Sequence, residues 1–259
     1  MLAAAAVAAA LAAFTPVVVH DASERFPLAS AAAVAPVSRD VSDRVPAAYG
    51  RAVSDARGGM WLQYWLFYAY QDQDRGIVRT GRHEGDWEVV QYRLSSDGRP
   101  VEALYAQHSG AERCGFSAVA LRGGRPVVYA AHGSHASYLQ AGTRDRMWPD
   151  PNDEADGRGL VVRPRLVPIT ADSPAWMRYA SPWGASRGSR LIPPEQDSPL
   201  GPAFQRDRWD APAFAASARS CQASCNTVGE CDGRETAVTF AGVLALLLAG
   251  LWRYRTRGQ

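Results

Sequence analysis

Short segments rich in aromatic and β-branched residues, separated by turn residues, constrain the fold of this chain most strongly. Asp97 and Gly98 follow one such segment, and Gly123 and Gly124 follow another, and both pairs are typical of hairpin turns. The predicted strands cover residues 61–70, 86–94, 101–108, 116–122 and 125–132. This spacing predicts an all-β protein, an antiparallel β-sandwich with long loops built on a five-stranded meander.

The N-terminal end differs from this middle part in composition. Met1 to Phe14 is almost entirely Ala, Leu and Val, which matches the length of the apolar core of a secretory signal but lacks a basic leader. We expect residues 1–35 to be a signal peptide and leader, with small-x-small cleavage sites at Ala31 to Ala33 and at Ala33 to Ala35. An alanine-rich helix is the alternative.

The C-terminal end predicts a membrane segment. Residues 236–252 carry no charge and are followed by Arg253, Arg255 and Arg257. At about 1.5 Å per residue this run spans roughly 25 Å, slightly less than a hydrocarbon core. We expect a transmembrane or sorting helix within residues 236–259 with a cytoplasmic C-terminus; a buried helix is the alternative. The arrangement resembles the myxobacterial type of sorting tail, in which the anchor is recognised and can be removed.

These ends define the predicted domain organisation and compartment. A linker at 36–57 leads into the β-sandwich domain at 58–218, and a Cys-containing linker at 219–235 precedes the tail. We expect the protein to be exported to the cell envelope or cell surface. Export permits disulfides, and the four candidates are Cys114, Cys221, Cys225 and Cys231. Three of them lie in the linker, so one of those three is left to pair elsewhere or stay free.

Composition excludes two classes of protein. With 259 residues and 47% hydrophobic residues, the chain is neither disordered nor collagen-like. Its 28 basic and 26 acidic residues give a formal charge of +2, which provides no electrostatic footprint for nucleic acid. We therefore expect no nucleic-acid partner.

Successive antiparallel strands bring polar residues from distant parts of the chain to one rim of the sheet. The residues that this rule gathers are Asp72, Asp74, His83, Glu84, Asp86, Glu88, His108, His132, Ser134 and His135. An even register between the second and third strands would place His108, Asp86 and Glu88 on one face, and an odd register would split them. The sequence alone leaves both registers open.

Asp86 and Glu88 open an otherwise apolar strand face, so their burial requires a positive partner. We expect a divalent cation held by His83, Asp86 and Glu88 together with Asp72 or Asp74, with Mg²⁺, Ca²⁺ or Mn²⁺ favoured and Zn²⁺ as an alternative. Arg75, Arg79 or Arg82 could replace the cation. We expect His108, His132, Ser134 and His135 to support the rim, although the His132–His135 pair could hold zinc.

Other catalytic patterns are weaker in this sequence. Ser109 and Ser134 lie near histidines but outside a GxSxG elbow. A Cys114 nucleophile beside His108 is conceivable, but a disulfide or buried thiol suits an exported protein better. The acids of residues 150–157 lack the full calcium-loop pattern and predict a solvated loop.

The segments LQYWLFYAYQDQD, GRHEGDWEVV, YAQHSG and RPVVYAAHGSHASY resemble the vacuolar protein sorting-associated protein 62-like domain family. HEGDWE is more distantly similar to the HxxDWE core of the necrosis-inducing cytolysins, which are secreted β-sandwich proteins with a divalent cation. That resemblance implies cation ligands at His83, Asp86 and Glu88, with Asp72 or Asp74 upstream. Gly85 departs from the cytolysin pattern, which has a second His there.

Three hypotheses follow for the rim. The leading one is a non-enzymatic, membrane-tethered module that binds a divalent cation and recognises an envelope component, a lipid headgroup or a glycan. The second is a metal-dependent hydrolase of the cell envelope with Glu84 or His108 as general base. The third is a purely structural rim in which His and Asp side chains hydrogen-bond loops.

Overall fold

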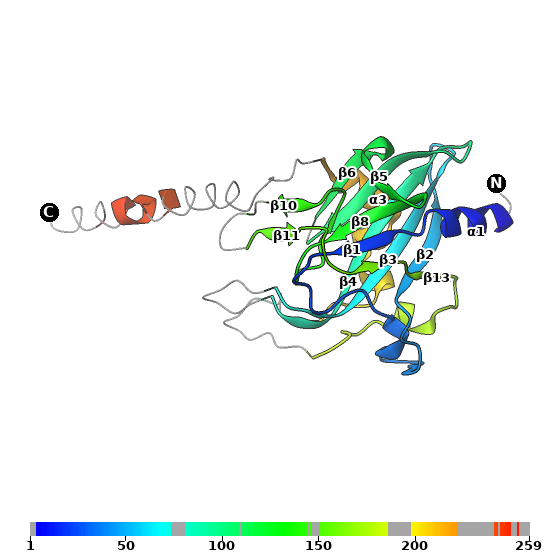
Figure 1. The fold of residues 1–259 in the computed structure, drawn as a ribbon, viewed down its shortest axis with the longest axis horizontal. Coiled ribbons are helices and arrows are strands. Elements are labelled where there is room, and N and C mark those ends of the chain that lie inside the picture. The colour runs from blue at the N-terminus through cyan, green and yellow to red at the C-terminus, as the bar shows by residue number, and fades with distance from the viewer. Residues whose placement is uncertain are drawn as a thin grey trace.

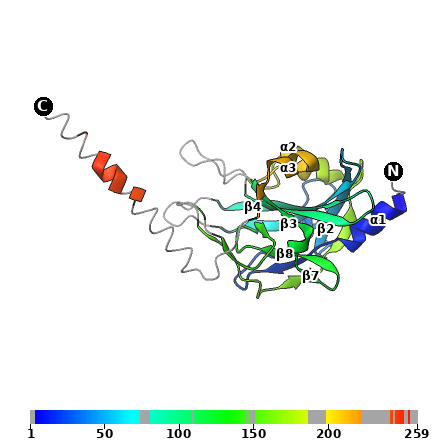
Figure 2. The same ribbon diagram turned by 90° about the horizontal axis from the view of Figure 1, so that it is seen from above.

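The computed structural model describes residues 4–73, 81–108, 110–144, 146, 151–185, 198–221, 241–242, 244–249 and 253. Its architecture is mostly β, with two main sheets packed face to face (Figures 1 and 2). The larger sheet has the strand order β13-β2-β3-β4-β5-β6-β14. Its strands are β2 Ala47–Ser54, β3 Met60–Gln71, β4 His83–Leu94, β5 Pro100–Gln107, β6 Gly110–Gly115, β13 Arg165–Pro168 and β14 Arg219–Ser220.

The second sheet has the order β12-β1-β8-β7, and β9 also pairs with β8. Its strands are β1 Val17–His20, β7 Leu121–Arg122, β8 Arg125–Ala130, β9 Ser137–Tyr138 and β12 Val161–Val162. A separate two-stranded ribbon pairs β10 Gly142–Arg144 with β11 Asp153–Ala155. Most pairs are antiparallel, but β1 with β8, β2 with β13 and β6 with β14 run parallel.

Alternating side chains give the larger sheet two buried faces. Tyr64, Leu66, Tyr68, Val90 and Tyr92 point into a core shared with the second sheet. The opposite face carries a cluster of aromatic residues that the helices α2 Arg206–Trp209 and α3 Ala211–Ser217 help to cover, as Figure 2 shows. That cluster includes Trp65, Phe67, Trp87, Trp176, Trp183 and Phe214. Near-continuous burial of β3 and β4 follows from this double cover.

The predicted meander is confirmed for three of its strands and differs at the fourth. Residues 61–70 and 86–94 fall in β3 and β4, residues 101–107 fall in β5, which ends one residue before the prediction, and Gly98 has the positive φ of its predicted turn. The fourth strand of the meander is β6, a segment without β-branched residues. Residues 116–122 instead form a 3₁₀ turn, Phe116–Ala118, and the two-residue strand β7, so the strand prediction there was wrong.

The fifth predicted strand, β8, belongs to the second sheet rather than to the meander. It pairs with β7 through the predicted Gly123–Gly124 turn, in which both glycines have positive φ. Phe116 packs against Phe14 and Tyr92, with ring centroids 5.8 and 5.7 Å apart. The apolar residues of this segment therefore pack in the core where the chain passes from one sheet to the other. A strand would give the same apolar pattern, so the sequence alone cannot tell the two apart.

The folded domain includes residues that the sequence assigns to a leader and a linker. The helix α1 Ala4–Ala13 precedes β1, which lies between β12 and β8 (Figure 1). The strand β2, within the predicted linker, pairs with β3 along seven residues. A 3₁₀ turn at Ala31–Ala33 packs on the outer aromatic cluster. The sandwich therefore begins well before residue 58.

Other parts of the chain complete the fold. Further 3₁₀ turns lie at Ala175–Arg178 and Pro202–Phe204. Cys114 and Cys221 form a disulfide between β6 and the end of β14, while Cys225 and Cys231 lie outside the described residues. Within the described part of the chain, no helix is long and apolar enough to cross a membrane. About half of the predicted span at 236–252 lies outside those residues, and the span stays a prediction.

Candidate functional site

A buried histidine joins three segments of the chain at the predicted rim. His135 is 0% exposed, and its Nδ1 lies 2.8 Å from Asp86 Oδ2. Its Nε2 lies 3.5 Å from Glu24 Oε1, an ion-pair distance without a hydrogen bond. The other Glu24 oxygen accepts a hydrogen bond from the Gly133 backbone at 2.8 Å. The His135 ring also stacks on Tyr68, with centroids 3.9 Å apart.

The electrostatics of this cluster make His135 a cation at neutral pH. Burial alone lowers the pKa of His135, but the hydrogen bond to Asp86 and the negative charges of Asp86 and Glu24 raise it to about 9. Burial opposes ionisation of Asp86 and Glu24 as well, yet His135 holds the pKa of both carboxyls below their usual range. The imidazolium therefore supplies the positive charge that the buried carboxylates require.

Glu88 behaves differently from Asp86 although both point to the same core. Burial raises the pKa of Glu88 well above its usual range, because the charged form is poorly solvated there. Its Oε2 is buried and has no hydrogen-bond partner among the described residues. The two acids of the HEGDWE segment are therefore not equivalent: Asp86 is paired with His135, and Glu88 has a buried oxygen without a hydrogen-bond partner among the described residues.

A second buried carboxylate, Asp153 on β11, gathers four side-chain donors. Its Oδ2 accepts hydrogen bonds from His108 Nε2 at 2.6 Å and from the Tyr138 hydroxyl at 2.6 Å. Its Oδ1 accepts from the Ser134 hydroxyl at 2.8 Å and from the Gln73 amide at 2.9 Å. Burial raises the pKa of Asp153, but the His108 hydrogen bond and charge outweigh it and lower the pKa to about 2.

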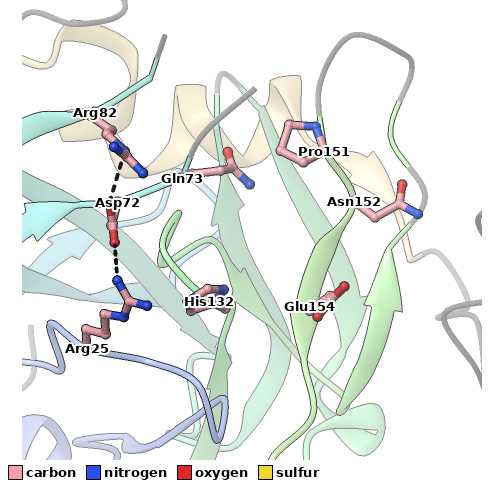
Figure 3. A pocket seen from close by; sticks show the side chains of 8 residues that line it. All are labelled: Arg25, Asp72, Gln73, Arg82, His132, Pro151, Asn152 and Glu154. Atoms are coloured by element: carbon pink, nitrogen blue, oxygen red, sulfur yellow. Dashed lines mark ion pairs between the residues drawn. The ribbon is translucent and has the colours of Figure 1, made fainter. Parts of the chain in front are cut away.

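Three of the predicted cation ligands have other partners within the protein. Asp72 forms ion pairs with Arg82 at 3.0 Å and Arg25 at 3.6 Å, as Figure 3 shows. His83 Nδ1 lies 2.8 Å from the Gly85 carbonyl, and Asp86 is paired with His135. Among the residues that the structure describes, no three His, Cys, Asp or Glu side chains converge to hold a metal, and Asp74 lies outside them.

The register between β4 and β5 does not set His108 level with the two acids of β4. The register between β4 and β5 pairs Val90 with Tyr105 and Gln91 with Leu104. Continued toward the rim, this odd register sets His108 level with Trp87, which points to the outer face. His108 then adopts a positive φ of 50° and turns to Asp153. The register that would bring His108 beside Asp86 and Glu88 does not form.

A polar pocket of about 330 Å³ opens beside these two clusters (Figure 3). Arginine, carboxylate and amide side chains form most of its walls. The negative charges of Asp72 and Glu154 match the positive charges of the two arginines in number. The lining therefore provides both hydrogen-bond donors and acceptors. The lining residues are Arg25, Asp72, Gln73, Arg82, His132, Pro151, Asn152 and Glu154.

Glu84 and Ser134 are held by loop contacts. Glu84 Oε2 accepts a hydrogen bond from the Ala185 backbone at 3.1 Å, which fastens the loop after Trp183 to the start of β4. Ser134 donates to Asp153. The interpretation of His132–His135 as a turn that hydrogen-bonds the rim agrees with this geometry, since the His132 backbone donates to the Glu154 carbonyl at 2.7 Å.

Sequence reasoning missed Glu24, Arg25 and Asp153. The first two fall inside the predicted leader, although charges such as those of His20-Asp21 and Glu24-Arg25 do not occur in an apolar signal core. These charged residues were the sequence signal that could have excluded the segment from an apolar signal core. Asp153 was expected in a solvated loop, and this was wrong because the side chain is 0% exposed. The alternating burial of Asp153, Glu154 and Ala155 is a strand pattern too short to recognise.

Comparisons with known proteins confirm the resemblance to the vacuolar protein sorting-associated protein 62-like family. The family model of vacuolar protein sorting-associated protein 62 matches residues 63–147. One similar structure, a necrosis and ethylene inducing protein 2 from the causal agent of cocoa's Witches Broom disease, is 16% identical, with 81% of this chain and 90% of that chain covered and a TM-score of 0.46.

Two further structures have the same kind of similarity. The non-toxic HaNLP3 protein is 12% identical, with 83% of this chain and 92% of that chain covered and a TM-score of 0.46. NLPPya in complex with glucosamine is 16% identical, with 67% of this chain and 80% of that chain covered and a TM-score of 0.43. No curated protein matches the chain.

The first prediction concerns the buried imidazolium. His135→Asn keeps a residue type that tolerates the positive φ of 55° but removes the charge, leaving Asp86 and Glu24 without a buried counterion. We expect the free energy of unfolding to fall by about 3–5 kcal/mol, measured by denaturant titration. The matched variant His132→Asn, at a partly exposed position, should cost less than about 0.5 kcal/mol. Equal losses in both variants would contradict the assignment.

The second prediction concerns acid stability. The folded-state pKa of Asp153, about 2, lies below its usual value of 3.8, so its contribution is complete above pH 4 and disappears as the pH falls through 2. This amounts to about 2 kcal/mol of unfolding free energy. Asp153→Asn should flatten the pH dependence of stability between pH 4 and pH 2. An unchanged slope in that variant would show that Asp153 is not the titrating group.

Proposed function

We propose that this chain is an exported β-sandwich protein, tethered through its C-terminal segment, that recognises a lipid headgroup or glycan of an envelope. The observation that carries the proposal is the polar pocket beside Asp72. Hydroxyl groups both donate and accept hydrogen bonds. A wall of guanidinium, carboxylate and amide groups suits a ligand with many hydroxyls or with charges of both signs, because each ligand group finds a complementary partner.

The pocket has features of a preformed site. Asp72 orients Arg25 and Arg82 from opposite sides, and its backbone donates to the Gly133 carbonyl at 2.9 Å. Gln73 reaches the pocket while its amide group is fixed by Asp153. Held side chains lose little conformational entropy when a ligand binds, which favours affinity. The two buried carboxylates, Asp86 and Asp153, stabilise the walls without lining the pocket.

Recognition accounts for this arrangement better than hydrolysis does. The two proposed general bases, Glu84 and His108, are both outside the set of described residues that line the pocket. Glu84 is bonded to a loop backbone and His108 Nε2 to Asp153. A general base must reach the proton that it abstracts directly or through one water. The pocket therefore supports a binding role for the rim.

A divalent cation remains part of the proposal as an addition that has to be tested. The unpartnered Oε2 of Glu88 is one available oxygen, but Asp72 and Asp86 already have positive partners. A cation would have to compete with Arg82 or with the His135 imidazolium for these carboxylates. Binding measurements with Mg²⁺, Ca²⁺, Mn²⁺ and Zn²⁺, and with chelator, separate cation-dependent from cation-independent recognition.

The third prediction tests the pocket. The full chain is titrated with vesicles of phosphatidylethanolamine or phosphatidylglycerol and with a panel of soluble hexoses and hexosamines. Arg25→Ala and Glu154→Ala should each weaken binding about tenfold or more, because a hydrogen bond to a charged group contributes about 1.5–3 kcal/mol.

The control is Arg99→Ala. Arg99 is an exposed arginine in the hairpin between β4 and β5, paired with Asp97, and it does not line the pocket. Its removal changes the net charge as Arg25→Ala does, so it separates a local contact from a general charge effect. Binding that is equally weak in Arg25→Ala and Arg99→Ala would contradict the pocket assignment, as would the lack of binding to every probe.

A further inference from the structure

We propose that a leader peptidase cleaves this chain on the N-terminal side of β1, at the Ala10–Leu11 or the Ala12–Ala13 bond, and that the segment at residues 31–35 is not cleaved. The inference rests on the export part of the proposed function and is independent of the pocket's ligand. It moves the boundary of the mature protein by about twenty residues and makes residues 17–35 a permanent part of the domain.

The strand β1 could not be lost without dismantling the second sheet. It lies between β12 and β8, and Val18 faces Val162 on one side and Val128 on the other. All four of its residues are buried, and Val18 belongs to the core between the sheets. Cleavage after Ala33 or Ala35 would remove a central strand and expose the edge of β8.

The segment after β1 is equally integrated. His20 Nδ1 lies 2.8 Å from the Leu160 carbonyl, and its Nε2 accepts a hydrogen bond from the Leu28 backbone at 3.0 Å. Glu24 balances the His135 imidazolium, and Arg25 forms one wall of the polar pocket. Loss of this segment would leave buried charge without its partner, which costs several kcal/mol.

The two candidate cleavage regions also differ in accessibility. Ala31 and Ala35 are 0% and 1% exposed, and the Ala31 backbone donates to the Tyr49 hydroxyl at 2.9 Å. By contrast, Ala12 and Ala13 at the end of α1 are exposed. In the folded chain, the Ala12–Ala13 bond therefore lies between two exposed residues, whereas Ala31 and Ala35, two of the small residues that would define a site at residues 31–35, are buried.

The helix α1 itself has the character of a leader. Its ten residues, AAAVAAALAA, have no polar face, yet most of them are exposed and Leu11 alone is buried. A helix that is apolar on every side belongs in a membrane or a core rather than on a wet surface. The apolar run ends at Phe14, and Thr15 and Pro16 lead into β1.

Small residues at the third and first positions before a bond define a leader-peptidase site. Ala8 and Ala10 fill these positions for the Ala10–Leu11 bond, and Ala10 and Ala12 fill them for the Ala12–Ala13 bond. Hydrolysis adds one water across the amide, leaving a carboxylate on the leader and an α-ammonium group on the mature chain. Because Ala10 is common to both sites, a single substitution blocks both.

The two bonds differ in what happens to Leu11. Its carbonyl accepts hydrogen bonds from Thr15 at 2.7 Å and from the Tyr64 hydroxyl at 2.9 Å, and its side chain packs in the core between the sheets. Cleavage at Ala10–Leu11 keeps these contacts, whereas cleavage at Ala12–Ala13 removes them. Both products retain β1, Glu24 and Arg25.

The experiment is intact-mass analysis and N-terminal sequencing of the full chain after expression in a bacterium with a general secretion pathway. We expect the exported protein to begin at Leu11 or Ala13. Ala10→Leu should accumulate as the uncleaved precursor, because a large side chain occupies the first or the third position of each site. The matched control Ala33→Leu, which alters both sites at residues 31–35 in the same way, should be processed like the wild type.

A mature N-terminus beyond Pro16, or a chain that retains Met1, would overturn the proposal. Normal processing of Ala10→Leu combined with blocked processing of Ala33→Leu would do the same. Failure of the ligand-binding proposal is seen separately, since it would leave the mass and N-terminus of the exported protein unchanged.

Discussion

The structure depends on one buried positive charge, the imidazolium of His135. Asp86 comes from the meander, Glu24 from the segment after β1, and His135 from the turn after β8, so the ion pairs join three segments distant in sequence. None of these groups is tolerable alone in the core, because an unpaired buried charge costs several kcal/mol. Only the complete cluster balances its charges, so it holds these three segments together in the folded chain.

This constraint places the polar pocket. The Gly133 backbone, two residues before His135, donates to Glu24 and accepts from the Asp72 backbone. Asp72 then orients Arg25 and Arg82, and Gln73 next to it reaches Asp153. The geometry of the pocket walls is therefore coupled to burial of the acids through shared backbone contacts, although the buried acids do not line the pocket themselves.

The sequence predicted the parts of this account that depend on local patterns. Alternation and turn residues located β3, β4, β5 and β8, and the antiparallel rule brought Asp72, Asp86 and His135 to one rim. The need for a positive partner was also inferred correctly for Asp86. The pairing of Asp86 with His135 was not anticipated, because the pKa of His135 depends on burial and on Glu24, which no local pattern reveals.

Elsewhere, contacts between segments that are distant in the sequence could not be predicted. The parallel pairing of β1 with β8 joins segments about 110 residues apart, so an apolar N-terminal strand was assigned to a leader. Asp153 is recognisable only through donors from three other segments: Gln73, His108, and the turn that carries Ser134. The choice between even and odd register depends on the geometry of the hairpin that turns at Asp97–Gly98. In this hairpin a bulge lies between Arg93 and Leu94 of β4.

The most direct test of the central claim is ¹⁵N NMR of the His135 imidazole in the full chain at pH 7. The account predicts that both ring nitrogens carry protons and that the ring loses one only as the pH rises through about 9. A neutral ring at pH 7, with one unprotonated nitrogen, would contradict the claim that an imidazolium balances Asp86 and Glu24.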